Sequence, residues 1–365
     1  MHVPDGFINT PVSVVTGVVA AGAVAVSLRG ARRELGGSSV ALAGAERTAP
    51  LAGLVAAFIF AVQMLNFPVG AGTSGHLLGG ALAAILVGPC TGVLCIAVVL
   101  LMQGILFADG GLTALGVNIT VMGVVTVVVA YGLFRGLVTI LPRTRRSVTG
   151  ASFVAALVSV PAAAAAFTLL YALGGVTDVP IASVFTAMVG VHTLIGIGEA
   201  GITMLTVGAV IAVRPDLVHG ARGMAAPLKL LVDGELVDAQ PAQPAQPAPA
   251  PAPARSPRRV WLAGLAAALV LAGFGSFYAS ASPDGLEKVA ADKGIDKSVE
   301  EHAAANSPLA DYGVESISDA RLSGGLAGVI GVGATVVVGS GVFWVARRRR
   351  SSGENAAPTP VQNSV

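Results

Sequence analysis

The sequence predicts an all-α membrane protein: a seven-helix bundle followed by a two-helix hairpin, with the N-terminus outside the cell. Hydrophobic residues make up 54% of the 365 residues and charged residues only 12%, whereas a soluble domain has about 25% charged residues. Long apolar runs recur along the chain, and basic residues gather in alternate loops. This composition excludes a soluble globular protein, a mostly disordered chain and a basic nucleic-acid-binding protein.

Nine apolar runs define the predicted helices in chain order, seven before a Pro/Ala-rich stretch and two after it. They cover roughly 11–28, 50–66, 75–88, 91–108, 117–141, 150–173 and 181–213, then 260–280 and 322–346. A membrane-spanning helix needs about 20 apolar residues. Run 75–88 is shorter than that, so a full helix, a tilted helix and a re-entrant segment are all open for it.

The distribution of basic residues predicts the orientation, because cytoplasmic loops are enriched in Lys and Arg. With nine spans and an outside N-terminus, 17 of the 22 basic residues fall on the cytoplasmic side. One span more or fewer would scramble this pattern. We therefore expect a multi-pass protein of a bacterial or archaeal cell membrane. The 17 residues are Arg29, Arg32, Arg33, Arg47, Arg143, Arg145, Arg146, Arg214, Arg222, Lys229, Arg255, Arg258, Arg259 and Arg347–Arg350.

Composition also divides the chain into units. Residues 239–257 read AQPAQPAQPAPAPAPARSP, which is typical of a stiff, extended linker without a core of its own. This linker separates a seven-helix unit, 1–238, from a two-helix unit, 258–350. The second unit encloses a polar outer segment, 281–321, that contains nine acidic residues. Residues 351–365 are expected to form a disordered tail.

The chain lacks the sequence signatures of an enzyme. A nucleotide-binding P-loop needs Gly-Lys-Ser/Thr, and the four lysines follow Leu228, Glu287, Asp292 and Asp296. No Ser–His pair, paired carboxylates or His-Glu-x-x-His motif stands out, so we expect no catalytic residues and no resident cofactor. If transport is driven by ATP, another subunit must supply the ATPase.

The position of His2 predicts a metal-binding N-terminus. If Met1 is retained, its amine and the His2 amide nitrogen close a five-membered chelate ring, and the amide and Nδ1 close a six-membered one. Ni(II) and Cu(II) favour such tetragonal nitrogen fields. A histidine that stands second by chance, without any role, is the alternative. His219 and His302 lie in polar segments and are expected to be solvated loop residues.

His76 is the second candidate ligand. It ends Gly-Thr-Ser-Gly-His at the start of run 75–88, where Thr73 or Ser74 is expected to cap the helix. A helix N-terminus disfavours the charged imidazolium and so keeps the ring able to bind metal. A loop histidine bonded to the backbone and a phosphate-binding glycine loop are the alternatives.

Charge in the outer loops argues against an anionic cargo. The predicted outer segments of the first unit contain Asp5, Asp109 and Asp178 and no Lys or Arg. Such a mouth attracts cations and repels anions. The expected cargo is therefore a cation.

Run 181–213 carries two ionisable residues, His192 and Glu199, which are seven positions apart and share one helix face. An unpaired charge within a span costs roughly 2.5–3.5 kcal/mol. His192 could support the metal ligands, Glu199 could contact a partner subunit, or both could make interior hydrogen bonds. A different alternative is a proton relay, which would make the chain a proton-coupled secondary transporter. For Asn66, Asn118 and Gln103, structural hydrogen bonding is expected.

Three motifs resemble one family. They are Met-His-Val-Pro-Asp-Gly-Phe at the N-terminus, Asn66-Phe-Pro-Val with the following Gly-Thr-Ser-Gly-His-Leu-Leu-Gly-Gly, and Phe107-Ala-Asp-Gly-Gly-Leu-Thr-Ala-Leu-Gly. They are similar to the CbiM/NikM family, the substrate-binding membrane subunits of energy-coupling-factor transporters for cobalt or nickel. Pro283-Asp-Gly-Leu-Glu-Lys-Val-Ala resembles the companion subunit CbiN/NikN. The chain thus looks like a fusion of the two.

The resemblance implies a function and a ligand set. It implies ATP-driven import of Ni²⁺ or Co²⁺ together with a CbiQ/NikQ-like membrane coupling subunit and a CbiO/NikO-like ATPase. It also implies that the second unit assists metal loading. Carried over to this sequence, the family's ligands are the Met1 amine, the His2 amide and imidazole, and His76. The Gly-Thr-Ser-Gly-His-Leu version looks more like the nickel branch. Asn66, Thr73, Ser74, Asn118, His192 and Glu199 are candidates to support the ligands.

Overall fold

The computed structural model describes residues 1–35, 48–70, 72–142, 144–221, 229–232, 235–238 and 258–348. The predicted linker 239–257 and tail 351–365 lie outside the described residues, as do some of the basic residues used to assign the orientation. The described residues of the two units include every predicted apolar run.

Helices dominate the structure. The α-helices are α1 (Thr10–Leu35), α2 (Thr48–Gln63), α3 (Gly80–Val87), α4 (Pro89–Leu106), α5 (Leu115–Asn118), α6 (Thr126–Ile140), α7 (Arg145–Gly174), α8 (Ile181–Val213), α9 (Arg258–Gly273), α10 (Gly285–Lys293) and α11 (Ala320–Arg348). A π-helical turn, η2 (Ile119–Val125), joins α5 to α6. Short 3₁₀ turns are η3 (Pro215–Leu217), η4 (His219–Ala221), η5 (Gly275–Tyr278), η6 (Asp296–Ser298) and η7 (Ala310–Tyr312).

In the part of the chain that the structure describes, strands are few and short. They form two antiparallel pairs, β1 (Phe67–Gly70) with β2 (Thr73–Gly75), and β3 (Lys229–Val232) with β4 (Glu235–Asp238). In the first pair Phe67 lies opposite Gly75 and Pro68 opposite Ser74. This hairpin carries the chain from α2 to His76 and positions that residue.

Among the described residues, six helical segments are long and apolar enough to cross a membrane, which confirms the predicted helical membrane fold. They are Thr10–Leu35, Pro89–Leu106, Leu115–Ile140, Arg145–Gly174, Ile181–Val213 and Ala320–Ala346. The other three predicted spans form shorter helices: α2 and α9 have 16 residues each, and α3 has 8. The count of nine spans therefore stays a prediction.

Run 75–88 begins in extended backbone and becomes helical only at Gly80. A helix of 8 residues rises about 12 Å, less than half of the hydrocarbon core of a membrane. All eight residues of α3 are buried, so the helix lies among other helices. The expected cap by Thr73 or Ser74 is wrong, because both residues lie in β2 and Gly79 precedes the helix.

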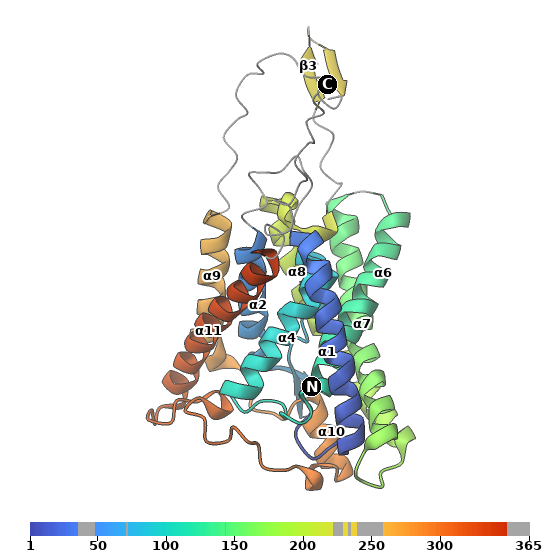
Figure 1. Ribbon diagram of the computed structural model, residues 1–365, viewed down its shortest axis with the longest axis vertical. Coiled ribbons are helices and arrows are strands. Elements are labelled where there is room, and N and C mark those ends of the chain that lie inside the picture. The colour runs from blue at the N-terminus through green and yellow to red at the C-terminus, as the bar shows by residue number, and fades with distance from the viewer. Residues whose placement is uncertain are drawn as a thin grey trace, which may run out of the picture.

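The second unit packs against α2 of the first. Figure 1 shows α9 and α11 beside α2 on one side of the molecule, with α6 and α7 on the other. Helices α2 and α11 approach so closely that a Cβ on Gly53 would lie 2.8 Å from the backbone nitrogen of Ser340. Small residues at such crossings are typical of membrane helix pairs.

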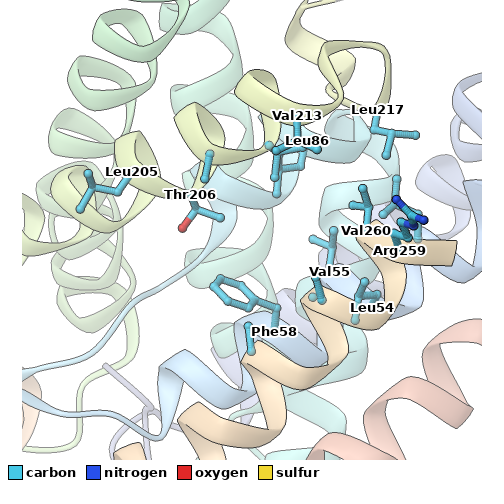
Figure 2. Close-up of a pocket in the computed structure, with 16 residues that line it drawn as sticks. Leu54, Val55, Phe58, Leu86, Leu205, Thr206, Val213, Leu217, Arg259 and Val260 are labelled. Atoms are coloured by element: carbon cyan, nitrogen blue, oxygen red, sulfur yellow. The ribbon is translucent and has the colours of Figure 1, made fainter. Parts of the chain in front are cut away.

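A large cavity lies between α2, α8 and α9, at the end of α9 that follows the linker. Its volume is about 660 Å³, and its lining is apolar except for Thr206 and Arg259 (Figure 2). No His, Cys, Asp or Glu side chain lines it. This cavity therefore offers no metal ligands, and the candidate site lies elsewhere.

The outer segment of the second unit covers the opposite end of the bundle, where the N-terminus also lies (Figure 1). Its backbone and that of Ser280, directly before it, make hydrogen bonds to three loops of the first unit. Ser280 N donates to Asn66 O at 2.7 Å, Glu300 N to Asp5 O at 3.1 Å, and Asp311 N to Phe107 O at 2.9 Å. These contacts bring residues of both units to one place.

Candidate metal centre

The N-terminal segment is extended and buried inside the bundle. Met1 is 3% exposed and Val3 is fully buried. The side chain of Asn118 accepts a hydrogen bond from Val3 N at 2.8 Å and donates one to Val3 O at 3.0 Å. Asn118 ends α5, directly before the π-helical turn, and such turns often occur at functional sites. Asn118 therefore fixes the backbone next to His2.

The three aspartates of the predicted mouth have different roles. Asp5 is buried and accepts hydrogen bonds from Leu112 N at 3.2 Å and Thr113 N at 2.8 Å, so it anchors the N-terminal segment to the loop after α4. Asp178 is exposed in the loop between α7 and α8. Asp109 lies beside His2. Among these three, the structure brings Asp109 to the candidate ligands.

Both ring nitrogens of His2 face oxygen acceptors. Nδ1 lies 3.1 Å from Asp109 Oδ1, and Nε2 lies 3.2 Å from Gln103 Oε1. The hydroxyl of Tyr312, from the second unit, donates to Asp109 Oδ2 at 2.6 Å. Burial alone would raise the pKa of Asp109, but His2 and Tyr312 together lower it to about 2. An ionised carboxylate therefore lies beside His2 Nδ1.

His76 presents its Nε2 to the N-terminus. Nδ1 lies 3.0 Å from Leu77 O, and because a carbonyl oxygen only accepts, Nδ1 carries the proton and Nε2 keeps its lone pair. Nε2 is hydrogen-bonded to the Met1 amine. The rings of His76 and His2 stack with centroids 4.9 Å apart. Burial and the neighbouring amine lower the pKa of His76, which favours the neutral ring that a metal requires.

The second unit contributes a carboxylate to the same place. Asp284 Oδ2 lies 2.7 Å from the Met1 amine nitrogen and 3.4 Å from His76 Nε2. Oδ1 accepts hydrogen bonds from Leu286 N at 2.7 Å and Glu287 N at 2.9 Å, as expected for the N-cap of α10. Burial opposes ionisation, but the amine and His76 hold the pKa of Asp284 well below its usual range.

The β1–β2 hairpin binds the backbone directly before Asp284. Ser74 N donates to Pro283 O at 2.9 Å, and Ser74 Oγ donates to Ser282 O at 2.7 Å. Ser74 thus contacts the second unit and not the candidate ligands. Its neighbour Thr73 is buried in β2. Asn66 accepts from the second unit through its backbone oxygen, as described above.

Glu199 supports the segment that follows His76. Its carboxylate accepts hydrogen bonds from Leu78 N at 2.6 Å and Gly79 N at 3.1 Å. These two amides precede α3 and lack helical partners, so Glu199 satisfies them. Because Glu199 has no exposed surface, it cannot contact a partner subunit in this conformation.

His192 is also fully buried, and its Nδ1 lies 2.8 Å from the backbone oxygen of Met188. Its Nε2 has no hydrogen-bond partner among the described residues. A Cβ on Gly285 would lie 3.1 Å from His192 Cε1, so α10 begins against this part of α8. His192 therefore packs beside the candidate centre without contacting the predicted ligands through a hydrogen bond.

Sequence reasoning missed the contributions of Asp284 and Tyr312. Asp284 followed by Glu287 three residues later is a capping-box pattern, which predicts the start of a helix. Nothing in that pattern indicates a contact with Met1, 283 positions away. The expectation for two other histidines is wrong: His302 Nε2 lies 3.3 Å from Gly110 O, and His219 Nε2 lies 3.0 Å from the Tyr131 hydroxyl, and both residues are half-buried.

The converging groups can provide a nitrogen-rich site for a divalent transition metal. Across the part of the chain that the structure describes, no three His, Cys, Asp or Glu side chains form a metal-holding group by themselves. The nitrogen atoms that lie close together are the Met1 amine, the His2 backbone amide next to it, and the imidazoles of His2 and His76. Imidazole and amine nitrogens suit nickel, copper and related ions.

Comparison with known proteins identifies relatives in metal transport. Residues 2–217 match the CbiM family, described as the cobalt uptake substrate-specific transmembrane region, and residues 258–348 match the PDGLE domain. A putative metal transport protein of Haloquadratum walsbyi is 40% identical over 60% of this chain and 93% of its own length. A putative fused nickel transport protein, NikMN, of Archaeoglobus fulgidus is 38% identical over 60% of this chain and 68% of its own.

A solved structure is similar as well. The crystal structure of a transition metal transporter matches with a TM-score of 0.50 and 26% identity, over 58% of this chain and 93% of that one. Together with the six helices suited to crossing a bilayer, these relatives identify a multi-pass membrane protein. The matched family is a metal-transport component and not an enzyme.

Proposed function

The chain belongs to the CbiM family of metal-uptake membrane proteins and carries a PDGLE domain, and from that premise we propose that it is the substrate-binding component of an ATP-driven importer for Ni²⁺ or Co²⁺. The single observation that supports the proposal is the convergence of the Met1 amine, His2 and His76 at the end of the bundle where the N-terminus is buried.

The chemistry of the proposed site follows from these donors. The captured ion takes the Met1 amine, the His2 amide nitrogen, His2 Nδ1 and His76 Nε2. Because the amine and amide must lose protons to bind, capture releases protons to the solvent. The stacked rings of His2 and His76 and the clamp of Asn118 on Val3 hold the donors close together before the ion arrives.

Nickel is the favoured cargo, since four nitrogen donors suit the tetragonal geometry of Ni(II), and a relative is named as a nickel transport protein. ATP hydrolysis would occur in a CbiO/NikO-like subunit, coupled through a CbiQ/NikQ-like membrane subunit. The second unit would assist loading, and the linker would keep it at a high effective concentration beside the site.

Metal binding to the purified chain tests the proposal. Titration with Ni²⁺ and Co²⁺ should show tight binding by the unaltered chain. His2→Ala and His76→Ala should each weaken binding by at least about 100-fold, because each removes a nitrogen donor and opens a chelate (~2.7 kcal/mol). His219→Ala is the matched control, because its ring contacts Tyr131 away from the site. Unchanged binding in both site variants would contradict the proposal.

A further inference from the structure

The two carboxylate oxygens of Asp284 do different things. Oδ1 caps α10 by accepting from Leu286 N and Glu287 N. Oδ2 points the other way, at 2.7 Å from the Met1 amine nitrogen and 3.4 Å from His76 Nε2. The side chain is only 10% exposed. A helix cap needs one oxygen, so the second anionic oxygen is available to the metal centre.

We propose that Asp284 Oδ2 becomes a ligand of the captured ion, so that the second unit adds an oxygen donor to the nitrogens of the first. This inference rests on the proposed function. Ligand atoms at about 2.0–2.1 Å from one ion and at right angles to each other lie about 3 Å apart. The distances from Oδ2 to the two nitrogens, 2.7 and 3.4 Å, lie on either side of that spacing.

The contacts of the Met1 amine indicate how Asp284 would meet a captured ion. The amine is a cationic group that now lies between His76 Nε2 and Asp284 Oδ2. A divalent ion bound to the amine nitrogen would meet the same two acceptors. Asp284 would then stay in place during capture, and its carboxylate would offset one positive charge of the ion in a buried site.

The fold holds Asp284 in this position from several directions. Ser74 binds the two residues before it, as described above. Glu287 accepts from Asp284 N at 2.8 Å and completes the capping box. Gly285 lies against α8, where a Cβ would be 2.8 Å from Ile195 Cδ1. The carboxylate is therefore placed by both units and does not depend on a flexible loop.

Asp284 would also change the geometry of the metal. Four nitrogens alone form a square-planar field, which Ni(II) accepts readily. An added carboxylate oxygen makes the ion five-coordinate. The contribution of the second unit can therefore be read from the coordination number of bound nickel, independently of transport.

Nickel K-edge X-ray absorption of the full chain loaded with Ni²⁺ tests this inference. The unaltered chain should lack the 1s→4p edge feature of square-planar nickel. Asp284→Asn should show it, because asparagine still caps α10 but has no anionic oxygen. Nickel affinity should fall at least about tenfold. Asp284→Ser, another good cap, should behave like the asparagine variant. Asp292→Asn, on the exposed face of α10, is the matched control.

Two results would overturn the inference while leaving the proposed function intact. One is a square-planar signature in the unaltered chain and in every variant. The other is tighter nickel binding by Asp284→Asn. That result would mean that the Asp284 carboxylate blocks the empty site and moves away when the ion binds. Failure of all four chains to bind nickel or cobalt would instead remove the proposed function and this ligand with it. Thermal unfolding of each variant in detergent reports whether α10 has kept its fold.

Discussion

Buried polar groups have different partners in the candidate metal centre and in the ionisable pair on α8, His192 and Glu199. At the candidate metal centre, Met1, His2, His76 and Asp284 come together from three segments of the chain. On α8, Glu199 binds backbone amides and His192 faces a backbone carbonyl. No hydrogen bond joins Glu199 to His192 among the described residues.

The difference separates a binding site from its support. In the candidate centre the Met1 amine, His76 Nε2 and Asp284 Oδ2 face one another and bind no backbone group of the described residues. These atoms can exchange their contacts for an ion, while His76 Nδ1 and Asp284 Oδ1 keep their backbone partners. A carboxylate that satisfies two buried N–H groups cannot leave them without a penalty. The candidate metal centre is therefore suited to capturing an ion. The α8 pair is suited to holding the His76 segment, and less suited to the proton relay of a secondary transporter.

Glu199→Ala should have the largest effect on stability. The change leaves Leu78 N and Gly79 N buried without an acceptor, at a cost of about 2–5 kcal/mol in the free energy of unfolding. Glu199→Gln keeps one acceptor oxygen and should lose about half as much. Thermal unfolding of the purified chain in detergent measures both. A normal melting temperature in Glu199→Ala, with proton-driven metal uptake abolished in proteoliposomes containing this chain alone, would favour the relay instead.

Asn118→Ala should weaken nickel binding by about 10–100-fold, because it releases the backbone of Val3 and so loosens His2. The measurement is a nickel titration of the purified chain. Asn66→Ala serves as the control, since Asn66 contacts the second unit through its backbone oxygen. Equal affinities for the two variants would show that the clamp on Val3 does not organise the site.

Tyr312→Phe should lower nickel affinity by about 3–10-fold, a smaller loss than that of Asn118→Ala. The change removes one hydrogen bond to Asp109, worth about 1 kcal/mol. The bond from Tyr312 to Asp109 links the second unit to the carboxylate beside His2. Tyr278→Phe is the matched control, because Tyr278 is 76% exposed. A titration in which both variants matched the unaltered chain would limit the second unit's influence to Asp284.

Asp178→Asn should have the smallest effect. The side chain is exposed and can act on a cation only through long-range attraction, which salt screens. The association rate of nickel should fall less than about threefold at low ionic strength, and the difference should vanish at high salt. Stopped-flow measurements would report this, and a salt-independent loss of affinity would place Asp178 closer to the ion than the structure does.

Much of the fold and part of the site could be predicted from the sequence. The apolar runs and the scarcity of charge identify a polytopic helical protein, because the bilayer requires long apolar helices. The chelate argument for His2 and the family motifs around His76 name two side chains that the structure brings into stacking contact. These signals are local in the sequence, and local patterns are what periodicity and motifs record.

Features that depend on distant contacts could not be predicted. Residues 76–79 stay outside α3 although run 75–88 is apolar, because Glu199 from α8 accepts hydrogen bonds from Leu78 N and Gly79 N. From the sequence, Asp5 is expected in the cation-attracting outer mouth, but its carboxylate is buried and bound to the loop after α4. The approach of Asp284 to Met1 depends on how α10 docks between β2 and α8, which no single-segment pattern encodes.

The central claim, that the Met1 amine is a metal donor, is tested most directly by moving that amine. A chain with one extra residue retained before Met1, as verified by mass spectrometry, should lose nickel binding by at least about 100-fold, because the five-membered ring between amine and His2 amide cannot form (~2.7 kcal/mol). The same residue inserted into the linker 239–257 is the control and should bind normally. Unchanged nickel affinity in the extended chain would contradict the account.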